Sequence, residues 1–245
     1  MADRFRDKVV IVTGAAGQIG GACVEAFLAE GARVGGIDLF DPPTPASGAI
    51  SVRADLEHEH EIERAFAEVE AALGPVGVLV QSAAVIARVP FLEITGENVD
   101  RILAVNVRAI LLGGRTAARS MIARGARDGA IVNLTSVSGV VSDAESVGYE
   151  ASKGAVTMAT KGMARALAPY GIRVNAVGPG SMAKFQELAP RDPSDLDEYE
   201  RRRIPLRRLG TGPEIAEAVM YLASPAASYV TGAVLYVDGG GLAAW

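Results

Sequence analysis

Two side chains four residues apart, Tyr149 and Lys153, are the residues of this sequence best suited to move a proton. At the start of a predicted helix this spacing places both on one face. A phenol with a pKa of about 10 is a poor base at neutral pH, but a neighbouring ammonium favours the phenolate. Such a pair can act as general acid and base. The spacing alone is common, so its meaning depends on the residues around it.

Two further polar residues strengthen this interpretation. Ser136 ends the predicted strand before that helix, thirteen residues ahead of Tyr149, and could hydrogen-bond a substrate oxygen. Asn106, in an upstream helix, could anchor a water that connects Lys153 to solvent. Together the four residues predict acid–base catalysis at an oxygen of the substrate.

A glycine-rich turn over residues 13–20 follows the first apolar run and precedes a helical pattern. Glycines let the backbone turn tightly and approach a pyrophosphate, whose charge is favoured by a helix N-terminus. Asp38 ends the next predicted strand, where a carboxylate accepts hydrogen bonds from the ribose hydroxyls of an adenosine and repels a 2′-phosphate. The following residue, Leu39, has no positive charge to attract such a phosphate. The pattern predicts a dinucleotide site that prefers NAD to NADP, and the alternative for Asp38 is a plain turn residue.

The end of the third predicted strand offers a contact for adenine. Asp55 could reach the ring with its side chain, and Leu56 could reach it with its backbone N–H. Asp55 is also a good N-cap for the helix predicted over 57–73, and the two roles are compatible.

The elements that must position these residues alternate along the chain, with short β-branched runs between longer helical patterns. Strands are expected at 8–13, 32–38, 49–55, 76–82, 129–136, 172–178 and 233–238, and helices up to 30 and at 57–73, 97–124, 149–169 and 213–223. This alternation predicts an α/β fold in which one parallel sheet carries helices on both faces. Ligands of such sheets bind at the carboxyl ends of the strands, where the polar candidates are expected. The proline-rich residues 41–48 predict an irregular crossover instead of a helix.

The composition limits the classes of function. Of 245 residues, 49% are hydrophobic and 22% charged, which is typical of one globular domain. The net charge of −5 disfavours nucleic acid and anionic membranes as partners. His58 and His60 lack metal-ligand spacing, so no metal site is expected. The single cysteine, Cys23, and the lack of a signal-peptide pattern predict a cytoplasmic protein.

Several segments resemble the short-chain dehydrogenase/reductase family, in the branch whose chains have about this length, and the likeness extends over nearly the whole chain. The matching segments are TGAAGQIG (13–20), Asp55-Leu56, LAVNV around Asn106, IVNLTS around Ser136, YEASK (149–153), IRVNAVGPG and YVTGAVLYVDGG. The resemblance implies a single-domain Rossmann-type fold, a doubly wound parallel sheet of about seven strands. It further implies a homotetramer in which the helices at 97–124 and 149–169 form one interface.

The resemblance also implies how the site works. In the family, a tetrad that here corresponds to Asn106, Ser136, Tyr149 and Lys153 transfers a hydride between a secondary alcohol and a ketone. Lys153 is expected to hold the nicotinamide ribose as well. The full set of expected NAD contacts is Gly14, Gly17, Gln18, Ile19, Gly20, Asp38, Leu39, Asp55, Leu56, Ala83, Tyr149, Lys153, Pro179, Gly180 and Met182.

Three positions depart from the family pattern. Gln18 stands where the turn usually has a glycine, so a side chain must be accommodated close to the pyrophosphate. The segment Gln81-Ser82-Ala83-Ala84 replaces a motif that commonly reads Asn-Asn-Ala-Gly, so the hydrogen bonds that tie the sheet must be remade. Lys184 replaces a threonine that can bind the nicotinamide carboxamide, and backbone groups around Met182 are expected to take over that contact.

The substrate side leaves several alternatives open. A lid is expected over 181–210, with a capping box at Ser194–Asp197 that opens a short helix. The run Arg201–Arg203 is either a solvated helix face or a site for an anionic substrate. Among enzymes, the alternatives to an NAD-dependent alcohol dehydrogenase are a 3-oxoacyl reductase and a cyclic-diol dehydrogenase. Outside enzymes, the alternative is a dinucleotide-binding regulator or scaffold without turnover, which the intact tetrad disfavours.

Overall fold

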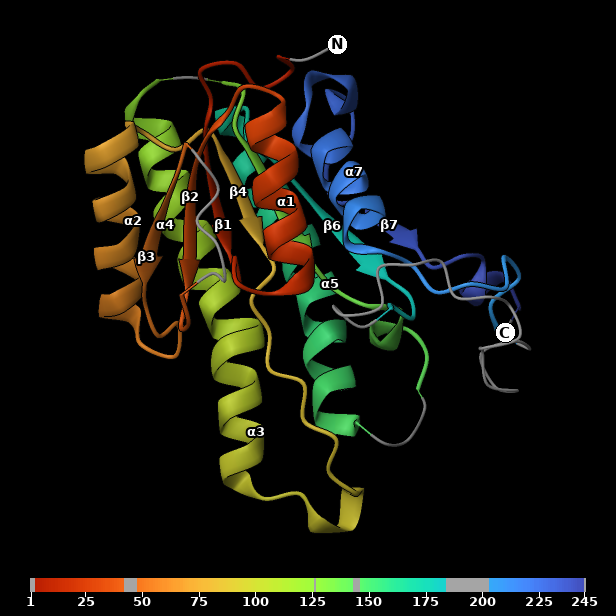
Figure 1. Ribbon diagram of the computed structural model, residues 1–245. Coiled ribbons are helices and arrows are strands. Elements are labelled where there is room, and N and C mark those ends of the chain that lie inside the picture. Colours follow the sequence, from red (N-terminus) through yellow and green to blue (C-terminus); the bar gives the residue numbers. More distant parts are fainter. Residues whose placement is uncertain (1–2, 42–47, 126, 143–145, 184–202, 245) are drawn as a thin grey trace.

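Seven parallel strands form one sheet at the centre of the molecule, seen here in a computed structural model (Figure 1). The structure describes residues 3–41, 48–125, 127–142, 146–183 and 203–244. The strands are β1 (Val9–Thr13), β2 (Arg33–Asp38), β3 (Ala49–Arg53), β4 (Val78–Gln81), β5 (Ala130–Leu134), β6 (Arg173–Pro179) and β7 (Val234–Val237). Their order across the sheet is β3-β2-β1-β4-β5-β6-β7, and every neighbouring pair is parallel. The predicted fold class is confirmed.

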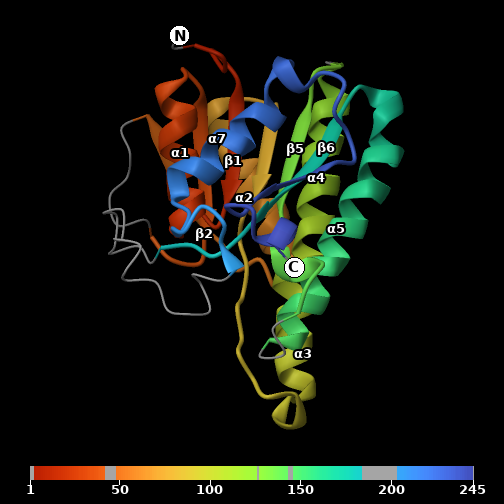
Figure 2. The same cartoon turned by 90° about the vertical axis from the view of Figure 1, so that its right-hand side faces the viewer.

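Helices cover both faces of this sheet (Figure 1, Figure 2). The helices that bear on the site are α1 (Gln18–Ala29), α2 (Glu59–Leu73), α3 (Gly96–Leu103), α4 (Ala109–Ala123), α5 (Val147–Leu167) and α7 (Gly212–Ala223). α1 and α7 pack together on one face, and α2, α4 and α5 cover the other, with an apolar cluster beneath each layer. β1 is buried along its whole length, because a strand covered on both sides must be apolar on both.

The strand order reverses between β1 and β4, which is where open α/β sheets bind ligands. All strands run toward the end of the molecule from which α3 projects, so their carboxyl ends share one edge (Figure 1). Thr13, Asp38, Gln81 and Leu134 are the last residues of β1, β2, β4 and β5. The polar residues expected at strand ends therefore gather along this edge.

The long helix predicted over 97–124 is divided into three parts. α3 ends at Leu103, a π-helical turn spans Ala104–Arg108, and α4 begins at Ala109. A π turn contains one more residue than an α turn, and hydrophobic periodicity does not reveal such an insertion. The prediction of one continuous helix was wrong at this point, and Asn106 lies at the centre of the inserted turn.

The other predicted helices and strands are confirmed, with boundaries shifted by one or two residues. Most of the 41–48 crossover, Lys184, the capping box at Ser194–Asp197 and two of the three arginines in the 201–203 run lie outside the described residues. Of the expected lid, residues 181–183 and 203–210 are described. No helix in the described ranges is both long and apolar enough to cross a membrane.

A buried chain of polar side chains ties β4 and β5 to the helices behind them. Gln81 donates from Nε2 to the carbonyl of Ile110 (3.0 Å) and to Oδ1 of Asn133 (2.9 Å). Asn133 in turn donates to Oγ1 of Thr160 on α5 (2.9 Å). All three side chains are buried, so each bond also removes the cost of an unpaired polar group. Gln81, where the resemblance has asparagine, therefore ties β4 to β5 and to α4.

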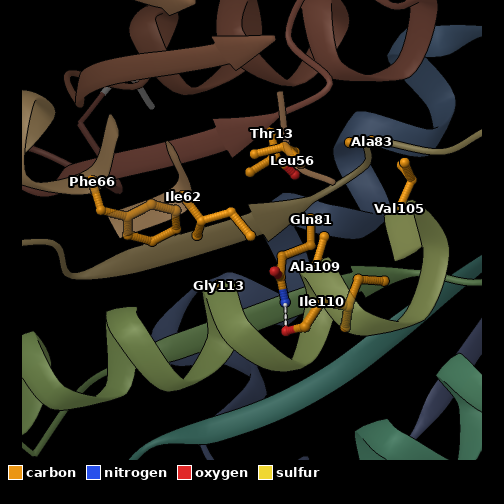
Figure 3. Close-up of a pocket in the computed structure, with 10 residues that line it drawn as sticks. All are labelled: Thr13, Leu56, Ile62, Phe66, Gln81, Ala83, Val105, Ala109, Ile110 and Gly113. Carbon is orange, nitrogen blue, oxygen red and sulfur yellow. Dashed lines mark hydrogen bonds between the residues drawn. The ribbon is translucent and has the colours of Figure 1, made fainter. Parts of the chain in front are cut away.

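A second tie and a small cavity lie at the same strand end. Ser82 donates from Oγ to the carbonyl of Thr13 (2.9 Å), which joins β4 to β1. Next to it is a cavity of about 10 Å³ (Figure 3). Its walls are Thr13, Leu56, Ile62, Phe66, Gln81, Ala83, Val105, Ala109, Ile110 and Gly113. That volume holds about one water molecule, so this cavity is not a substrate pocket.

Candidate active site

Tyr149, Ser136 and Lys153 come together where β5 ends and α5 begins. Tyr149 lies in the first turn of α5, and its phenol lies close enough to the hydroxyl of Ser136, two residues beyond β5, for that hydroxyl to lower its pKa. Lys153 lies one turn further along, with Nζ 5.5 Å from the centre of the Tyr149 ring. The three side chains singled out by their spacing therefore share one site.

Burial shifts the two titrating groups in opposite directions. Removal from water raises the pKa of the Tyr149 phenol, and the nearby Ser136 hydroxyl partly offsets this rise. The same removal lowers the pKa of Lys153 to about 8, since the residue is only 2% exposed. Nζ of Lys153 donates to the carbonyl of Leu134 at 2.8 Å. At neutral pH the site holds a neutral phenol beside a buried ammonium.

Two hydroxyl groups that the sequence analysis missed hold this turn of α5 in place. Thr135 donates from Oγ1 to the carbonyl of Lys153 (2.8 Å). Ser152 donates from Oγ to the carbonyl of Tyr149 (2.6 Å) and accepts from Nδ2 of Asn106 (3.0 Å). The one signal in the sequence is position, because each hydroxyl directly precedes a member of the tetrad.

Asn106 is fully buried and uses its amide to fix the segment after β4. Oδ1 accepts from the N–H of Val85 (2.7 Å), and Nδ2 donates to the carbonyl of Val85 (3.0 Å). The second hydrogen of Nδ2 goes to Ser152. Both amide hydrogens are thus engaged within the protein. The side chain therefore has no hydrogen left to donate to a water, and a water anchored at Asn106 would be held by the backbone of the π turn.

In the turn between β1 and α1, two glycines have no space for a side chain, and the third faces open space. A Cβ added to Gly14, whose φ is +72°, would meet the backbone N of Ala83 at 2.6 Å. One added to Gly20 would meet the carbonyl oxygen of Gly14 at 2.0 Å. Gly17 is exposed, and a Cβ there would meet only that same oxygen, at 3.2 Å. The open side of the turn is therefore at Gly17.

This open side meets the N-terminus of α1. Within the described residues no side chain caps the helix, so its first backbone N–H groups are directed out of the helix end. Such groups, together with the helix dipole, bind the negative charge of a pyrophosphate. The turn therefore fits the phosphates of a dinucleotide.

Asp38 is fixed at the end of β2 by two backbone N–H groups. Oδ2 accepts from Ala16 at 2.9 Å, and Oδ1 accepts from Phe40 at 3.1 Å. The first bond joins the carboxylate to the glycine-rich turn. Each oxygen can accept one more hydrogen bond, which is what a pair of ribose hydroxyls requires. Leu39 beside it is 36% exposed and uncharged.

Asp55 caps a turn ahead of α2 instead of the helix itself. Its Oδ1 accepts from the N–H of Glu57 (2.9 Å), and its own N–H donates to Glu61 (2.9 Å). α2 begins at Glu59, and its N-cap residue is His58. Asp55 lies three residues before that position, so the prediction that it is the N-cap of this helix was wrong. Leu56 is buried in the cluster beneath α2.

The other expected cofactor contacts lie along the same edge. Ala83 follows β4 and packs against Gly14. Pro179 ends β6, and a Cβ added to the next residue, Gly180, would lie 2.7 Å from the Cα of Asp238. Ile19 packs on the apolar cluster beneath α1. The described residues contain no group of three or more His, Cys, Asp or Glu side chains that could hold a metal ion.

The chain after β6 forms a short parallel bridge. Met182 is paired with Gly210: the N–H of Ala183 donates to the carbonyl of Gly210, and the N–H of Gly210 donates to the carbonyl of Ser181, both at 3.0 Å. In such a bridge the N–H and C=O of Met182 itself point away from Gly210. Gln18 reaches this bridge, because its Nε2 donates to the carbonyl of Ala183 at 2.7 Å. The side chain expected beside the pyrophosphate is engaged with the segment after β6.

Comparisons with known proteins identify the same family over nearly the whole chain. Residues 14–241 match the family model described as enoyl-(acyl carrier protein) reductase. The galactitol 2-dehydrogenase (L-tagatose-forming) of Cereibacter sphaeroides is 40% identical over 246 residues, which cover 97% of this chain and 96% of that protein. The 2-(R)-hydroxypropyl-CoM dehydrogenase of Xanthobacter autotrophicus is 37% identical over 245 residues, covering 95% and 97%.

A solved structure agrees with these sequences. A mutant short-chain dehydrogenase/reductase from Serratia marcescens superposes with a TM-score of 0.83 at 32% identity, covering 97% of this chain and 98% of that one. An identity of this size over the full length of both chains shows common descent as well as a common fold. The chain belongs to the short-chain dehydrogenase/reductase family and is an oxidoreductase.

Proposed function

We propose that the protein is an NAD-dependent dehydrogenase that interconverts a secondary alcohol and a ketone, with Tyr149 as its acid–base residue. The observation that carries the proposal is the convergence of Tyr149, Ser136 and Lys153 at the edge of the sheet, with Nζ of the buried Lys153 5.5 Å from the centre of the Tyr149 ring. A phenol and a hydroxyl that converge from two elements can both bind one substrate oxygen. Nicotinamide, when bound, accepts or donates the hydride at the carbon that carries this oxygen.

Each residue of the tetrad has a distinct role in this proposal. In reduction the neutral phenol of Tyr149 gives its proton to the carbonyl oxygen and becomes a phenolate; in oxidation Tyr149 must first be ionised, and its phenolate then takes the hydroxyl proton, while Ser136 holds the oxygen. The ammonium of Lys153 favours the phenolate of Tyr149 by direct electrostatic attraction. Because its pKa is lowered to about 8, Lys153 also releases a proton more readily than an exposed lysine. A water on the backbone of the π turn around Asn106 would carry that proton to solvent.

The preference for NAD is supported by the position of Asp38. The carboxylate is tied to the N–H of Ala16 in the cofactor turn, so it lies close to where an adenosine ribose would follow the pyrophosphate. There it would accept from both ribose hydroxyls, and its charge would repel a 2′-phosphate. A 3-oxoacyl reductase, which generally uses NADP, is less compatible with this arrangement.

The substrate class is supported by the names of the two relatives. Both are named for a reaction at carbon 2, where a hydroxyl is flanked by two carbon atoms. We extend that class, a secondary hydroxyl within a small polyol or a substituted alkyl chain, to this protein.

We also propose that the protein is a homotetramer and is located in the cytoplasm. α4 and α5 expose apolar side chains toward the outside of the molecule, with Leu111 45%, Ile122 39% and Met158 65% exposed. Burial of such side chains between copies would stabilise an assembly. The single thiol, Cys23, is buried and its pKa is raised to about 12 by burial, which makes it inert and compatible with a reducing compartment.

The experiment that tests the function is a substrate screen on the purified protein, followed at the absorbance of reduced nicotinamide. Polyols, 2-alkanols, cyclic diols and the corresponding ketones are offered with NAD and with NADP, and a 3-oxoacyl and an enoyl thioester are offered with the reduced cofactors. The proposal expects oxidation of at least one secondary alcohol with NAD preferred. Turnover of the thioesters alone, or a clear preference for NADP, would contradict it.

A further inference from the structure

Gln18 joins two parts of the chain that lie 165 residues apart in sequence. It is the first residue of α1, directly after the exposed Gly17 at the open side of the cofactor turn. Its Nε2 donates to the carbonyl oxygen of Ala183 at 2.7 Å. That carbonyl belongs to the parallel bridge formed by residues 181–183 and Gly210, named here the β6 bridge. A single side chain thus connects the turn with the β6 bridge.

The main chain of Gln18 also lies against the start of α7, which follows Gly210 by two residues. A Cβ added to Gly212, the first residue of α7, would meet the carbonyl oxygen of Gln18 at 2.9 Å and its Cγ at 3.6 Å. The start of α7 is fixed by a capping box between Thr211 and Glu214, and Glu214 also pairs with Arg208 at 2.6 Å. Gln18 therefore lies between the capped start of α7 and the β6 bridge.

The β6 bridge determines where the peptide groups of Met182 point. Because the N–H of Ala183 bonds to Gly210 while its C=O bonds to Gln18, both groups of Ala183 are fixed. In this parallel bridge Gly210 bonds to the residues on either side of Met182, so the N–H and C=O of Met182 itself point away from Gly210. A glycine at position 18, the usual residue of the family, would have no side chain to hold Ala183.

We infer that Gln18 is a positioning residue that couples the cofactor turn to the β6 bridge and so presents the backbone of Met182 to the nicotinamide end of the cofactor. This inference rests on the proposed NAD-dependent function, which it deepens. Without the hydrogen bond, the β6 bridge has more conformations before the cofactor arrives, and binding must order it. The loss therefore weakens cofactor binding more than it slows the chemical step.

The test uses the full-length protein and three variants. Gln18→Met keeps the length of the side chain but removes the donor, and Gln18→Ala removes both. Glu25→Ala, on the exposed face of the same helix, is the matched control. Hydrogen–deuterium exchange is measured on peptides that contain Ala183 and Gly210, and kcat and the KM for NAD are measured with the best substrate.

We expect faster exchange at the β6 bridge in both Gln18 variants, and a KM for NAD raised about twofold to tenfold, the range for one neutral hydrogen bond. Exchange of β4 and β5, kcat at saturating NAD and the control variant should match the wild type. Unchanged exchange at the β6 bridge, or an unchanged KM for NAD, would overturn the inference. If the wild type itself does not bind NADH, the proposed function fails instead, while the exchange data still show whether the link exists.

Discussion

Lys153 carries its charge in a place where burial disfavours it. Its pKa falls from 10.5 to about 8 on folding, and it is held by Thr135 on its backbone and by Leu134 at its ammonium. A residue chosen for stability alone would be apolar here, since replacing a buried charge by a hydrophobic group of similar size is often neutral or stabilising. The charge is retained, in this account, because Tyr149 needs it.

This view predicts how stability changes with pH. Between pH 8 and 10.5 the unfolded chain binds a proton at Lys153 that the native protein has lost, so the Lys153 contribution to stability rises with pH over that window. Below pH 8 both states are protonated and the contribution is constant, at a cost on the order of 3 kcal/mol. Lys153→Met should therefore abolish turnover but unfold at the same or a higher urea concentration at pH 7.

The matched control for this prediction is Lys161→Met, eight residues further along α5 and exposed. It should leave activity and the pH dependence of stability unchanged. The interpretation of Lys153 is wrong if Lys153→Met and the wild type lose stability in parallel as pH falls from 10.5 to 8.

A second prediction at this scale concerns the choice of cofactor. Asp38→Ala removes a charged acceptor expected to bind two ribose hydroxyls, and such bonds contribute about 1.5–3 kcal/mol each. The ratio of kcat/KM for NAD to that for NADP should fall at least about tenfold, with NADP use rising because the repulsion is gone. A ratio that stays constant would place the ribose elsewhere.

Among the elements, the glycine-rich turn contains one glycine required for packing, Gly20, and one expected to be required for cofactor binding, Gly17. Gly20→Ala puts a methyl group against the carbonyl of Gly14, so it should destabilise the fold by about 1–3 kcal/mol, as overpacking does. Gly17→Ala meets only a 3.2 Å contact in a backbone conformation that alanine adopts readily. It should melt within a few degrees of the wild type yet bind NADH more weakly, because the methyl group occupies the open side of the turn.

Thermal unfolding and NADH fluorescence titration of the two variants test this contrast. If Gly17→Ala binds NADH as tightly as the wild type, the pyrophosphate does not approach the turn from that side.

The same turn shows what the sequence could reveal about the site. The glycine pattern and the acid at the end of the next strand were enough to predict a dinucleotide turn, because their roles depend on local spacing. The partner of Gln18 could not be predicted, since Ala183 is distant in sequence and offers only a backbone carbonyl. The π turn at Asn106 was missed for a related reason: one inserted residue leaves the hydrophobic pattern of a helix almost unchanged.

Across the whole molecule, parallel topology brings the site together. The strand order was not readable from the sequence alone, but alternating strands and helices, with the resemblance, predicted that the ends of β1, β2, β4 and β5 share an edge. The side chains that hold the tetrad, Thr135 and Ser152, depend on packing between β5, α5 and the π turn, which no local pattern encodes.

A prediction at this scale concerns assembly. Copies that bury the exposed apolar side chains of α4 and α5 should sediment as a tetramer at micromolar concentration. Replacing Leu111 and Met158 by glutamate should shift the sedimentation coefficient toward smaller species. A wild-type protein that sediments as a monomer would contradict the proposed assembly without affecting the catalytic assignment.

The central claim, that Tyr149 transfers the proton, is tested most directly by comparing Tyr149→Phe with the wild type in NADH binding and in turnover of the best secondary alcohol. We expect NADH binding to weaken by no more than about tenfold, the loss of one hydrogen bond, while kcat falls by about 100- to 10,000-fold, the usual contribution of a general acid–base residue. Tyr229→Phe, a fully exposed tyrosine, should behave as the wild type. Undiminished kcat in Tyr149→Phe would contradict the account.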